Sequence, residues 1–333
     1  MKKRFLFFTL IMSCLLLHAQ EGNNFYEKGK AHMRQGDYEK ASLLLIKAFE
    51  QDPSNTAIAK DLAFNYYFLR ENGKALEIIK PLLDKDQTDE QVFQIAGNIY
   101  RAMDMLKETE ALYKKGIRKF PKNGIMYNEY GEFLSLQQNE NAINQWEKGI
   151  EMDPSYANNY YNAAKYYYFT TDKIWGIIYA EIFLNIEPQS ARTAEVKNIL
   201  LDSYKKLFAD TELSKITKDK NSFEKAFLQT ISKEISLASG GLTAETLTMI
   251  RTRFIINWFE NYANNFSYKL FDLHQQLLRE GMFDAYNQWI FGATQNLDAY
   301  QKWTASYSTE YSEFTSFQKG RIFKIPAGQY YHK

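Results

Sequence analysis

Cysteine is almost absent from this chain. Its 333 residues include one cysteine, Cys14, which lies in an apolar run at the N-terminus. If that run is removed, the chain has no disulfide bond, no thiolate metal site and no cysteine nucleophile. Histidine is scarce too, and His274 stands alone on its predicted helix without the HExxH spacing of a zinc site. We therefore expect no metal ion and no cofactor.

Other features of enzymes and nucleic-acid binders are missing. Gly240-Gly241 lacks the preceding strand and the following Lys-Ser/Thr of a phosphate-binding loop. No serine lies in a G-x-S-x-G nucleophile elbow. The formal net charge of +1 argues against nucleic-acid binding, which needs a strongly basic surface. The sequence predicts that the protein is not an enzyme and does not bind nucleic acid.

The N-terminus has the pattern of a secretory signal. Three basic residues, Lys2 to Arg4, precede an apolar run of 13 residues from Phe5 to Leu17. This run is too short to cross a bilayer, which takes about 20 residues. We expect a signal peptide over residues 1–20, cleaved after Ala19 or Gln20. The mature protein would then have no transmembrane segment and would lie in the periplasm, or at the periplasmic face of the outer membrane, of a bacterium.

One alternative concerns the same segment. Ile11 to Cys14 is similar to a lipoprotein box, which would place a lipid anchor on Cys14. Against this, the apolar run continues through Leu15, Leu16 and Leu17, where a lipid-anchored mature end should become polar.

A period of about 34 residues runs through the first two-thirds of the chain. Prolines end four of the units, and a unit without a terminal proline ends near Gln87; the prolines are Pro53, Pro121, Pro154 and Pro188. Each ending follows a pair of helical patterns. A fixed period of this size predicts stacked helical hairpins, which present a surface and do not enclose a catalytic pocket.

The first repeat shows the pattern most clearly. Gly29 lies at the centre of one predicted helix, and Ala41 and Ala48 mark a face of the next, so the two helices can approach closely. This unit resembles the tetratricopeptide repeat, which places small residues at such positions and a proline at its end. Four further units share the pattern, through Ala63, Tyr66 and Ala75; Gly97, Tyr100 and Gly116; Gly131, Ala142 and Trp146; and Ala164, Tyr167 and Ala180. Leu82 and Thr109 depart from it, since small residues are usual there.

The resulting fold prediction is all-α. We expect a right-handed superhelical stack of tetratricopeptide hairpins over residues 22–209, with about five repeats and a capping helix, followed by a C-terminal helical unit over residues 222–318. The polar segment 210–221 would be the hinge between them. Residues 319–333 contain Pro326-Ala327-Gly328 and are expected to form an irregular tail.

The resemblance implies a protein-binding groove on the first helices of the hairpins. Side chains that point away from the partner helix would line it: Tyr26, Lys30, Arg34, Lys60, Phe64, Tyr67, Gln94, Asn98, Arg101, Asn128, Glu132, Tyr161, Lys165 and Tyr168. This set is aromatic and moderately basic, which favours an extended or helical protein segment with some preference for acidic residues.

These observations predict an exported scaffold or adaptor protein that binds another protein within a bacterial envelope assembly. An alternative is a glycan or small-ligand binding protein, in which Tyr160-Tyr161 or Tyr166 to Tyr168 offers rings for stacking. A third interpretation, a catalytic C-terminal unit, needs a polar pocket in residues 224–310 with converging carboxylates or His274.

Overall fold

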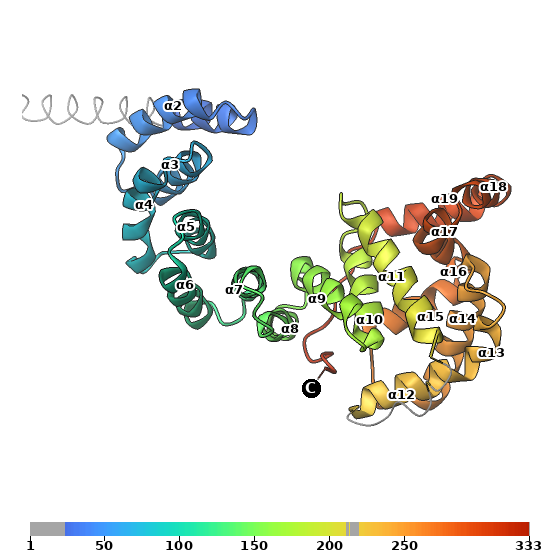
Figure 1. The fold of residues 1–333 in the computed structure, drawn as a ribbon. Coiled ribbons are helices and arrows are strands. Elements are labelled where there is room, and N and C mark those ends of the chain that lie inside the picture. The colour runs from blue at the N-terminus through green and yellow to red at the C-terminus, as the bar shows by residue number, and fades with distance from the viewer. Residues whose placement is uncertain (1–23, 211–212, 214–219, 333) are drawn as a thin grey trace, which may run out of the picture. The chain divides into compact units, whose positions relative to one another are not determined.

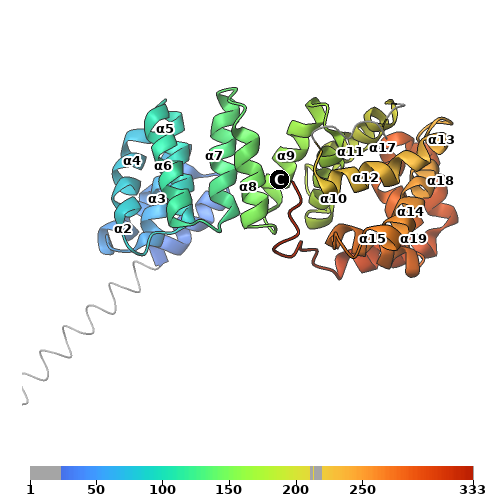
Figure 2. The same cartoon turned by 90° about the horizontal axis from the view of Figure 1, so that it is seen from below.

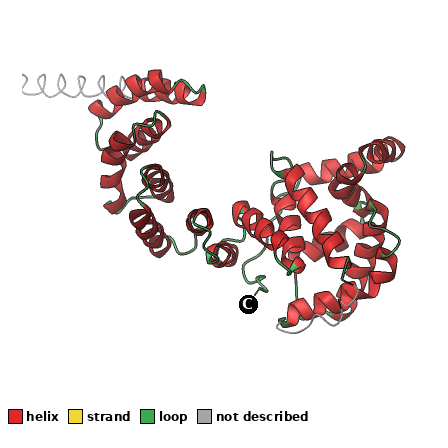
Figure 3. Cartoon of the chain, viewed as in Figure 1, coloured by secondary structure: helices red, strands yellow, loops and turns green. Residues whose placement is uncertain are grey.

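The computed structural model describes residues 24–210, 213 and 220–332. The predicted signal peptide and Cys14 therefore lie outside the described residues. Every regular element within these ranges is a helix, and most helices pair as antiparallel hairpins (Figure 3). This confirms the predicted all-α fold. The chain forms two compact units, which divide between Pro121 and Lys122.

The first unit is a stack of three hairpins. The helix of residues 24–34 precedes α2 (Tyr38–Gln51), α3 (Thr56–Phe68) pairs with α4 (Asn72–Ile79), and α5 (Glu90–Ala102) pairs with α6 (Leu106–Lys119). The short 3-10 helix η1 (Lys80–Asp84) extends α4. Within this unit α3 packs against α5, so the first helices of successive hairpins share one layer (Figure 1).

Asparagine and aspartate set where several of these helices begin. The Asn55 side chain accepts hydrogen bonds from the first amides of α3, and Asp89 accepts one from Val92 at 3.1 Å at the start of α5. Such caps satisfy amides that have no partner inside the helix. The caps explain why the turns between hairpins are polar.

A left-handed turn residue recurs inside each of the first four hairpins. Gly36 has a φ of 77°, and the equivalent residues Arg70, Asp104 and Gln138, each 34 positions further on, have φ values of 60°, 56° and 56°. The amide of the residue after each turn donates to a carbonyl five positions back, as from Glu71 to Tyr66 at 2.9 Å. This backbone conformation costs a non-glycine residue roughly 1–2 kcal/mol. The packing of the two helices of the hairpin therefore holds these residues in the left-handed conformation despite its cost.

The second unit begins with two more hairpins. Helix α7 (Gly124–Leu136) pairs with α8 (Ala142–Met152), and α9 (Ala157–Phe169) pairs with α10 (Lys173–Ile186). Helix α11 (Thr193–Phe208) packs against both α9 and α10. It therefore takes the place of the first helix of a sixth hairpin, where the sequence predicted a capping helix.

The rest of the second unit is a helical bundle. Its elements are α12 (Ser222–Ile231), η3 (Ser232–Glu234), α13 (Ile235–Ala238), α14 (Ala244–Asn261), α15 (Lys269–Arg279), α16 (Phe283–Asn287), the π-helix η4 (Gln288–Gly292), α17 (Ala293–Gln295), α18 (Leu297–Ser306) and α19 (Ser308–Lys319). Both ribbon views place α12, α14 and α15 near α10 (Figures 1 and 2).

The compact units differ from the domains expected from the sequence. The predicted boundary at residues 210–221 lies inside the second unit, which also contains the fourth and fifth repeats. Helix α10 is the reason, because every residue from Ile174 to Asn185 is buried. A second helix of an ordinary hairpin would leave one face in water. Here the C-terminal bundle covers that face, so the end of the repeat array and the bundle share a core.

A buried polar cluster joins α10 to the bundle. The carboxylate of Glu181 on α10 is ion-paired with Arg251 on α14 and accepts hydrogen bonds from Tyr286 and His274, both at 2.8 Å. Burial alone would raise the pKa of Glu181, but the charge of Arg251 and these hydrogen bonds lower it to about 2. Burial also lowers the pKa of His274, so this imidazole is neutral at pH 7 and carries its proton on Nε2, which faces Glu181. The ion pair therefore persists at neutral pH.

The C-terminal tail is irregular, as predicted, but it is packed against the fold. Tyr331 stacks on Phe223 with ring centroids 4.8 Å apart, and its carbonyl accepts a hydrogen bond from Asn221 at 2.8 Å. The His332 imidazole lies 2.9 Å from the carboxylate of Glu147 on α8. The tail thus links the bundle to the repeats within the second unit.

Small residues allow the helices of each hairpin to approach. A Cβ atom at Gly131 on α7 would lie 2.4 Å from Nε1 of Trp146 on α8, a buried residue. The equivalent atom at Gly97 would lie 2.3 Å from the Tyr113 hydroxyl. At both positions the neighbouring large side chain leaves no room for a Cβ atom, so only glycine fits without a shift of that side chain.

Replacing Glu181 tests the polar cluster. Glu181→Gln leaves the guanidinium of Arg251 buried without its counter-charge, which should lower the free energy of unfolding by about 3–5 kcal/mol. Glu187→Gln is the control, because Glu187 and Arg192 form a half-exposed pair with an expected effect of about 0–1 kcal/mol. Urea denaturation followed by circular dichroism measures both.

The same pair of proteins gives a pH test. The folded-state pKa of Glu181 lies below its ordinary value of 4.5, so its contribution is complete above pH 4.5 and is lost as the pH falls towards about 2. The stability difference between the native protein and Glu181→Gln should shrink over this interval. An unchanged difference, or equal effects of the two substitutions, would contradict the account.

Replacing Gly131 tests the close helix approach. Gly131→Ala forces Trp146 to move and should destabilise the protein by about 1–3 kcal/mol. Gly176→Ala on α10 is the matched control, because its nearest neighbour, Ser203 Oγ, would lie 3.4 Å from the new Cβ atom, and alanine favours helix over glycine by up to about 1 kcal/mol. Thermal unfolding should show that the two substitutions change the midpoint temperature in opposite directions or by clearly different amounts. Equal changes in the midpoint temperature would mean that Trp146 does not set the distance between α7 and α8.

Candidate protein-binding surface

Equivalent positions of successive repeats touch one another along the layer of first helices. In the second unit, hydrogen bonds join side chains 34 residues apart: Asn162 to Asn128 at 2.9 Å, Tyr161 to Glu195 at 2.6 Å and Tyr168 to Asp202 at 3.5 Å. These residues come from α7, α9 and α11. We call the exposed face of these three helices the second-unit surface.

Two of the predicted residues begin this surface on α7. The Asn128 amide donates to the Glu132 carboxylate at 2.9 Å, and Asn162 on α9 donates to the same carboxylate at 3.3 Å. Asn128 is buried, whereas Glu132 and Asn162 are half-exposed. The predicted pair is therefore brought together, and Asn128 acts mainly by positioning the other two.

The remaining predicted residues of this unit lie on α9. Lys165 approaches the Tyr161 hydroxyl at 3.2 Å and the Glu195 carboxylate at 3.2 Å. The hydrogen bond from Tyr161, with the charges of Lys165 and Arg192, holds the pKa of Glu195 below its ordinary value. The Arg192 guanidinium covers the Tyr161 ring at 4.6 Å. This end of the surface is a network of paired charges and rings.

A pocket of about 400 Å³ lies between α7 and α9 on this surface. Apolar side chains flank it, and two of them are strongly exposed: Leu136 at 74% and Phe169 at 81%. Polar side chains complete the lining; the full set is Glu132, Ser135, Leu136, Trp146, Asn162, Lys165, Tyr166 and Phe169. Exposed apolar rings rimmed by hydrogen-bonding groups are typical of protein interfaces.

The first unit carries the other predicted residues on its own first helices. The Tyr26 hydroxyl donates to Asp61 at 2.8 Å, and the Lys30 ammonium lies over the Tyr26 ring at 4.9 Å. Burial and Asp61 raise the pKa of Tyr26, so it remains a hydrogen-bond donor. Arg34 ends the same helix and is exposed.

Lys60 and Arg101 are engaged by neighbours in this unit. Lys60 forms an ion pair with Asp89 at 2.5 Å and also donates to Gln91 at 2.9 Å. Arg101 donates to Asn98 at 2.6 Å. Lys60 here and Lys165 in the second unit are therefore both paired with carboxylates, so the surface is less basic than the sequence alone indicated.

Phe64 and Tyr67 belong to an aromatic cluster. Phe68 makes an edge contact with Phe64 at 4.6 Å, stacks on Tyr38 at 4.5 Å and lies 5.7 Å from Tyr67. Phe64 and Tyr67 are half-exposed, and Phe68 is 42% exposed. The cluster therefore offers rings to a partner while packing against its own helices.

Sequence reasoning missed several members of the second-unit surface. Three of them lie 34 residues after a predicted residue: Asn162 after Asn128, Glu195 after Tyr161 and Asp202 after Tyr168. Adding the repeat length to the predicted positions would therefore have identified them. Leu136 and Phe169 gave no such signal, because their exposure at the ends of α7 and α9 depends on where those helices stop.

The tyrosine runs do not form a continuous ring platform. Tyr160 and Tyr167 are buried, at 1% and 7% exposure, while Tyr161, Tyr166 and Tyr168 are half-exposed. Tyr167 donates to Glu147 at 2.6 Å inside the second unit. A sugar face therefore cannot lie across adjacent tyrosines, and this disfavours the glycan alternative.

The C-terminal bundle contains the kind of pocket that the catalytic interpretation required. Glu245, Asp284 and Glu310 line it, while His274 lies elsewhere in the buried polar cluster. Hydrogen bonds hold the pKa of Glu245 below its ordinary value, against the effect of burial, so Glu245 is ionised at neutral pH and is no general acid. In the described part of the chain, no group of three or more His, Cys, Asp or Glu side chains is placed to hold a metal ion. None of the described helices could span a bilayer.

The family model for the tetratricopeptide repeat matches residues 32–99, which span parts of the first three hairpins. Tetratricopeptide proteins generally mediate protein–protein interactions, and scaffolds of this family are typically non-catalytic. No curated protein matches the sequence.

Several solved structures are also similar to the chain. They include pilF of Pseudomonas aeruginosa, 17% identical, covering 64% of this chain and 98% of its own, with a TM-score of 0.46. A thermophilic repeat protein of Thermus thermophilus is 15% identical, covering 56% and 98% of the two chains with a TM-score of 0.43. A third, from Parabacteroides merdae, is 14% identical, covering 78% and 98% with a TM-score of 0.42. The family match over residues 32–99, with the stacked hairpins, shows that the chain carries tetratricopeptide repeats.

Proposed function

We propose that this protein is an exported scaffold or adaptor that binds another protein non-covalently through the first helices of its repeats. The observation that carries the proposal is the pocket between α7 and α9. It combines exposed Leu136 and Phe169 with the polar groups of Glu132, Asn162 and Lys165. Large exposed apolar side chains supply contact area, and the surrounding polar groups orient a bound chain.

The form of the surface suggests the kind of partner. Hydrogen-bonding groups recur at the 34-residue offset on α7, α9 and α11, so each first helix presents such groups at equivalent positions, which form successive steps from one helix to the next. An extended segment or an amphipathic helix can use such steps, with an apolar side chain in the pocket. Because Lys60 and Lys165 are already paired with Asp89 and Glu195, we assign the surface no strong preference for acidic partners.

Export is a separate part of the proposal. It rests on the basic residues Lys2 to Arg4, the apolar run Phe5 to Leu17 and the small residue Ala19. Together they support a location in the periplasm, or at the periplasmic face of the outer membrane, and a role in a bacterial envelope assembly.

Photo-cross-linking tests the binding surface. A benzoylphenylalanine residue is placed at Phe169 in the full chain, expressed in cells, irradiated and analysed by mass spectrometry. Because Phe169 is 81% exposed beside the pocket, we expect one or two dominant protein adducts. Asn144 is the matched control, since it is exposed on α8, a second helix outside the surface.

The comparison of the two positions decides the result. Adducts at Phe169 that are absent at Asn144, and that weaken when Leu136 is changed to Ser, would support the assigned surface. Equal adducts at both positions, or adducts at Asn144 alone, would place binding elsewhere.

The mature N-terminus tests export. Mass spectrometry of the protein isolated from a bacterial envelope fraction should find Gln20 or Glu21 as the first residue. A chain that begins with a lipid-modified Cys14 would show the lipoprotein alternative. A chain that retains residues 1–20 in the cytoplasmic fraction would contradict export.

A further inference from the structure

The second unit has a pocket between the loop that follows α10 and the end of α19. Its volume is about 370 Å³, within the range of about 300–1,000 Å³ that small-molecule sites occupy. We call it the loop pocket; its lining comes from residues 187–190 of the loop and from Gln318, Lys319 and Arg321. None of these residues belongs to the second-unit surface, so the loop pocket is a separate feature of the protein.

Two buried nitrogen atoms of the lining residues have no hydrogen-bond partner in the described part of the chain. They are Nε2 of Gln318, a residue that is 6% exposed, and Nη1 of Arg321. Neighbouring atoms cover both of them, so bulk water does not satisfy them either. Buried donors are normally paired, and an unpaired one costs free energy. A ligand that supplies hydrogen-bond acceptors would remove this cost.

The loop pocket also carries positive charge that no carboxylate balances. Within the described ranges neither Lys319 nor Arg321 forms an ion pair. The carboxylate of Glu187, which lines the pocket, accepts hydrogen bonds from Nη2 of Arg192 at 2.9 Å and is therefore already neutralised. Burial lowers the pKa of Arg321, and Tyr286 opposes this effect. A bound anion would stabilise the charged guanidinium.

The guanidinium of Arg321 is held in place by its neighbours. Its Nη2 donates to Oδ1 of Asn185 on α10 at 2.7 Å, and its central carbon lies 5.2 Å from the ring centroid of Phe317. These contacts leave Nη1 without an acceptor. Gln189 and Lys319 line the same pocket and are exposed, so their flexible side chains can swing aside to admit a ligand. The loop pocket thus combines a fixed guanidinium with a flexible rim.

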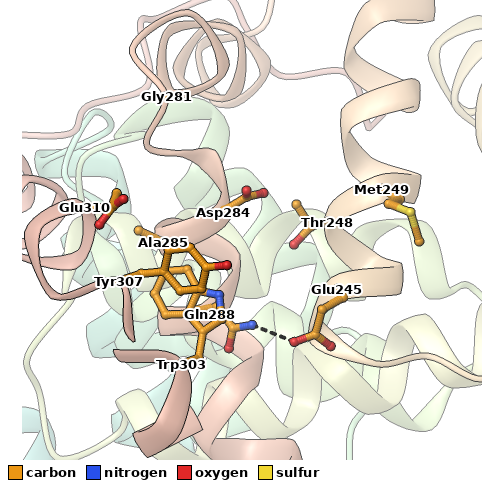
Figure 4. A pocket seen from close by; sticks show the side chains of 10 residues that line it. All are labelled: Glu245, Thr248, Met249, Gly281, Asp284, Ala285, Gln288, Trp303, Tyr307 and Glu310. Carbon is orange, nitrogen blue, oxygen red and sulfur yellow. Dashed lines mark hydrogen bonds between the residues drawn. The ribbon is translucent and has the colours of Figure 1, made fainter. Parts of the chain in front are cut away.

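The pocket lined by Glu245, Asp284 and Glu310 differs in this respect. Its buried amide, Gln288, donates to Glu245 at 2.9 Å (Figure 4). None of its lining residues has a buried polar atom without a partner. We therefore assign no ligand to that pocket.

We propose that the loop pocket binds a carboxylate group. The two carboxylate oxygen atoms accept hydrogen bonds from Gln318 Nε2 and Arg321 Nη1, and Lys319 and Arg321 balance the negative charge. A carboxylate has one oxygen atom for each of the two free donors, whereas a phosphate group brings further oxygen atoms for which the lining has no other buried free donor. The carboxylate can come from an aspartate or glutamate side chain of a protein or from a free organic acid.

Calorimetry with the mature chain tests this proposal. The first probe is Nα-acetyl-glutamate N-methylamide, and the matched control ligand is the glutamine analogue, which has the same shape without the charge. We expect the glutamate compound to bind and the glutamine compound to bind at least about ten-fold more weakly. Raising the salt concentration should weaken only the charged ligand.

Substitution of Gln318 separates binding from folding. Gln318→Met keeps the length of the side chain and removes the unpaired buried donor. It should therefore raise the midpoint temperature of thermal unfolding while weakening the binding of the glutamate compound about ten-fold. A substitution that only damaged the fold would lower that temperature.

A pair of lysine variants locates the site. Lys319→Gln should weaken binding of the glutamate compound about three-fold or more, because Lys319 lines the loop pocket. Lys324→Gln is the matched control, since Lys324 is also exposed but lies outside the lining. Thermal unfolding checks that both variants fold.

The outcomes separate the two sources of the carboxylate. Tighter binding of a glutamate-containing tetrapeptide than of succinate assigns the loop pocket to a protein side chain, and the reverse order assigns it to a free organic acid. The proposal is overturned by equal binding of the glutamate and glutamine compounds or by unchanged binding in Gln318→Met. Equal effects of the two lysine variants, tighter binding of inorganic phosphate than of the glutamate compound, or no binding at millimolar concentration would also overturn it.

Discussion

Each hairpin in the repeats can bury its apolar face only by stacking on the next one, and the rest of the structure follows from that requirement. The stacking fixes an offset of 34 residues, which is visible in the side-chain pairs Asn128–Asn162 and Tyr161–Glu195. It also holds Arg70, Asp104 and Gln138 in a left-handed conformation that none of them favours alone. Because the offset is constant, equivalent side chains line up on the first helices and create a surface.

A repeat stack must also end, since its last hairpin would otherwise expose an apolar face. Here the C-terminal bundle covers α10, and the ion pair between Glu181 and Arg251 lies within that contact. A buried ion pair adds little net stability compared with apolar packing, but removing one partner is costly. We interpret the pair as a device that fixes the arrangement of α10 against the bundle. The proposed binding surface on α7, α9 and α11 therefore belongs to a unit with an ordered core.

Much of the repeat architecture could be predicted from the sequence. Small residues such as Gly131 and large ones such as Trp146 recur at fixed spacing, so they identified the hairpins. Proline and aspartate endings such as Asp52-Pro53 marked the end of α2 correctly. These features are local in the sequence and recur in every repeat, so they can be recognised without a structure.

Other features depend on contacts between distant residues and could not be predicted. Nothing in the sequence around Glu181 indicates that it meets Arg251, 70 positions away, or that α10 is covered on both faces. The sequence also contained no indication that Lys60 forms an ion pair with Asp89. The surface was therefore expected to be more basic than it is. The π-helix at Gln288 and the pocket lined by Glu245, Asp284 and Glu310 lie where short helices meet, and helical periodicity is weakest there.

The central claim is that the first helices of the repeats are the face that binds a partner protein. Hydrogen–deuterium exchange of the mature chain tests it most directly, with and without the protein captured at Phe169. The account predicts slower exchange in α7, α9 and α11 on binding, with α8 unchanged. Slower exchange confined to α8, or to the bundle beyond α11, would contradict it.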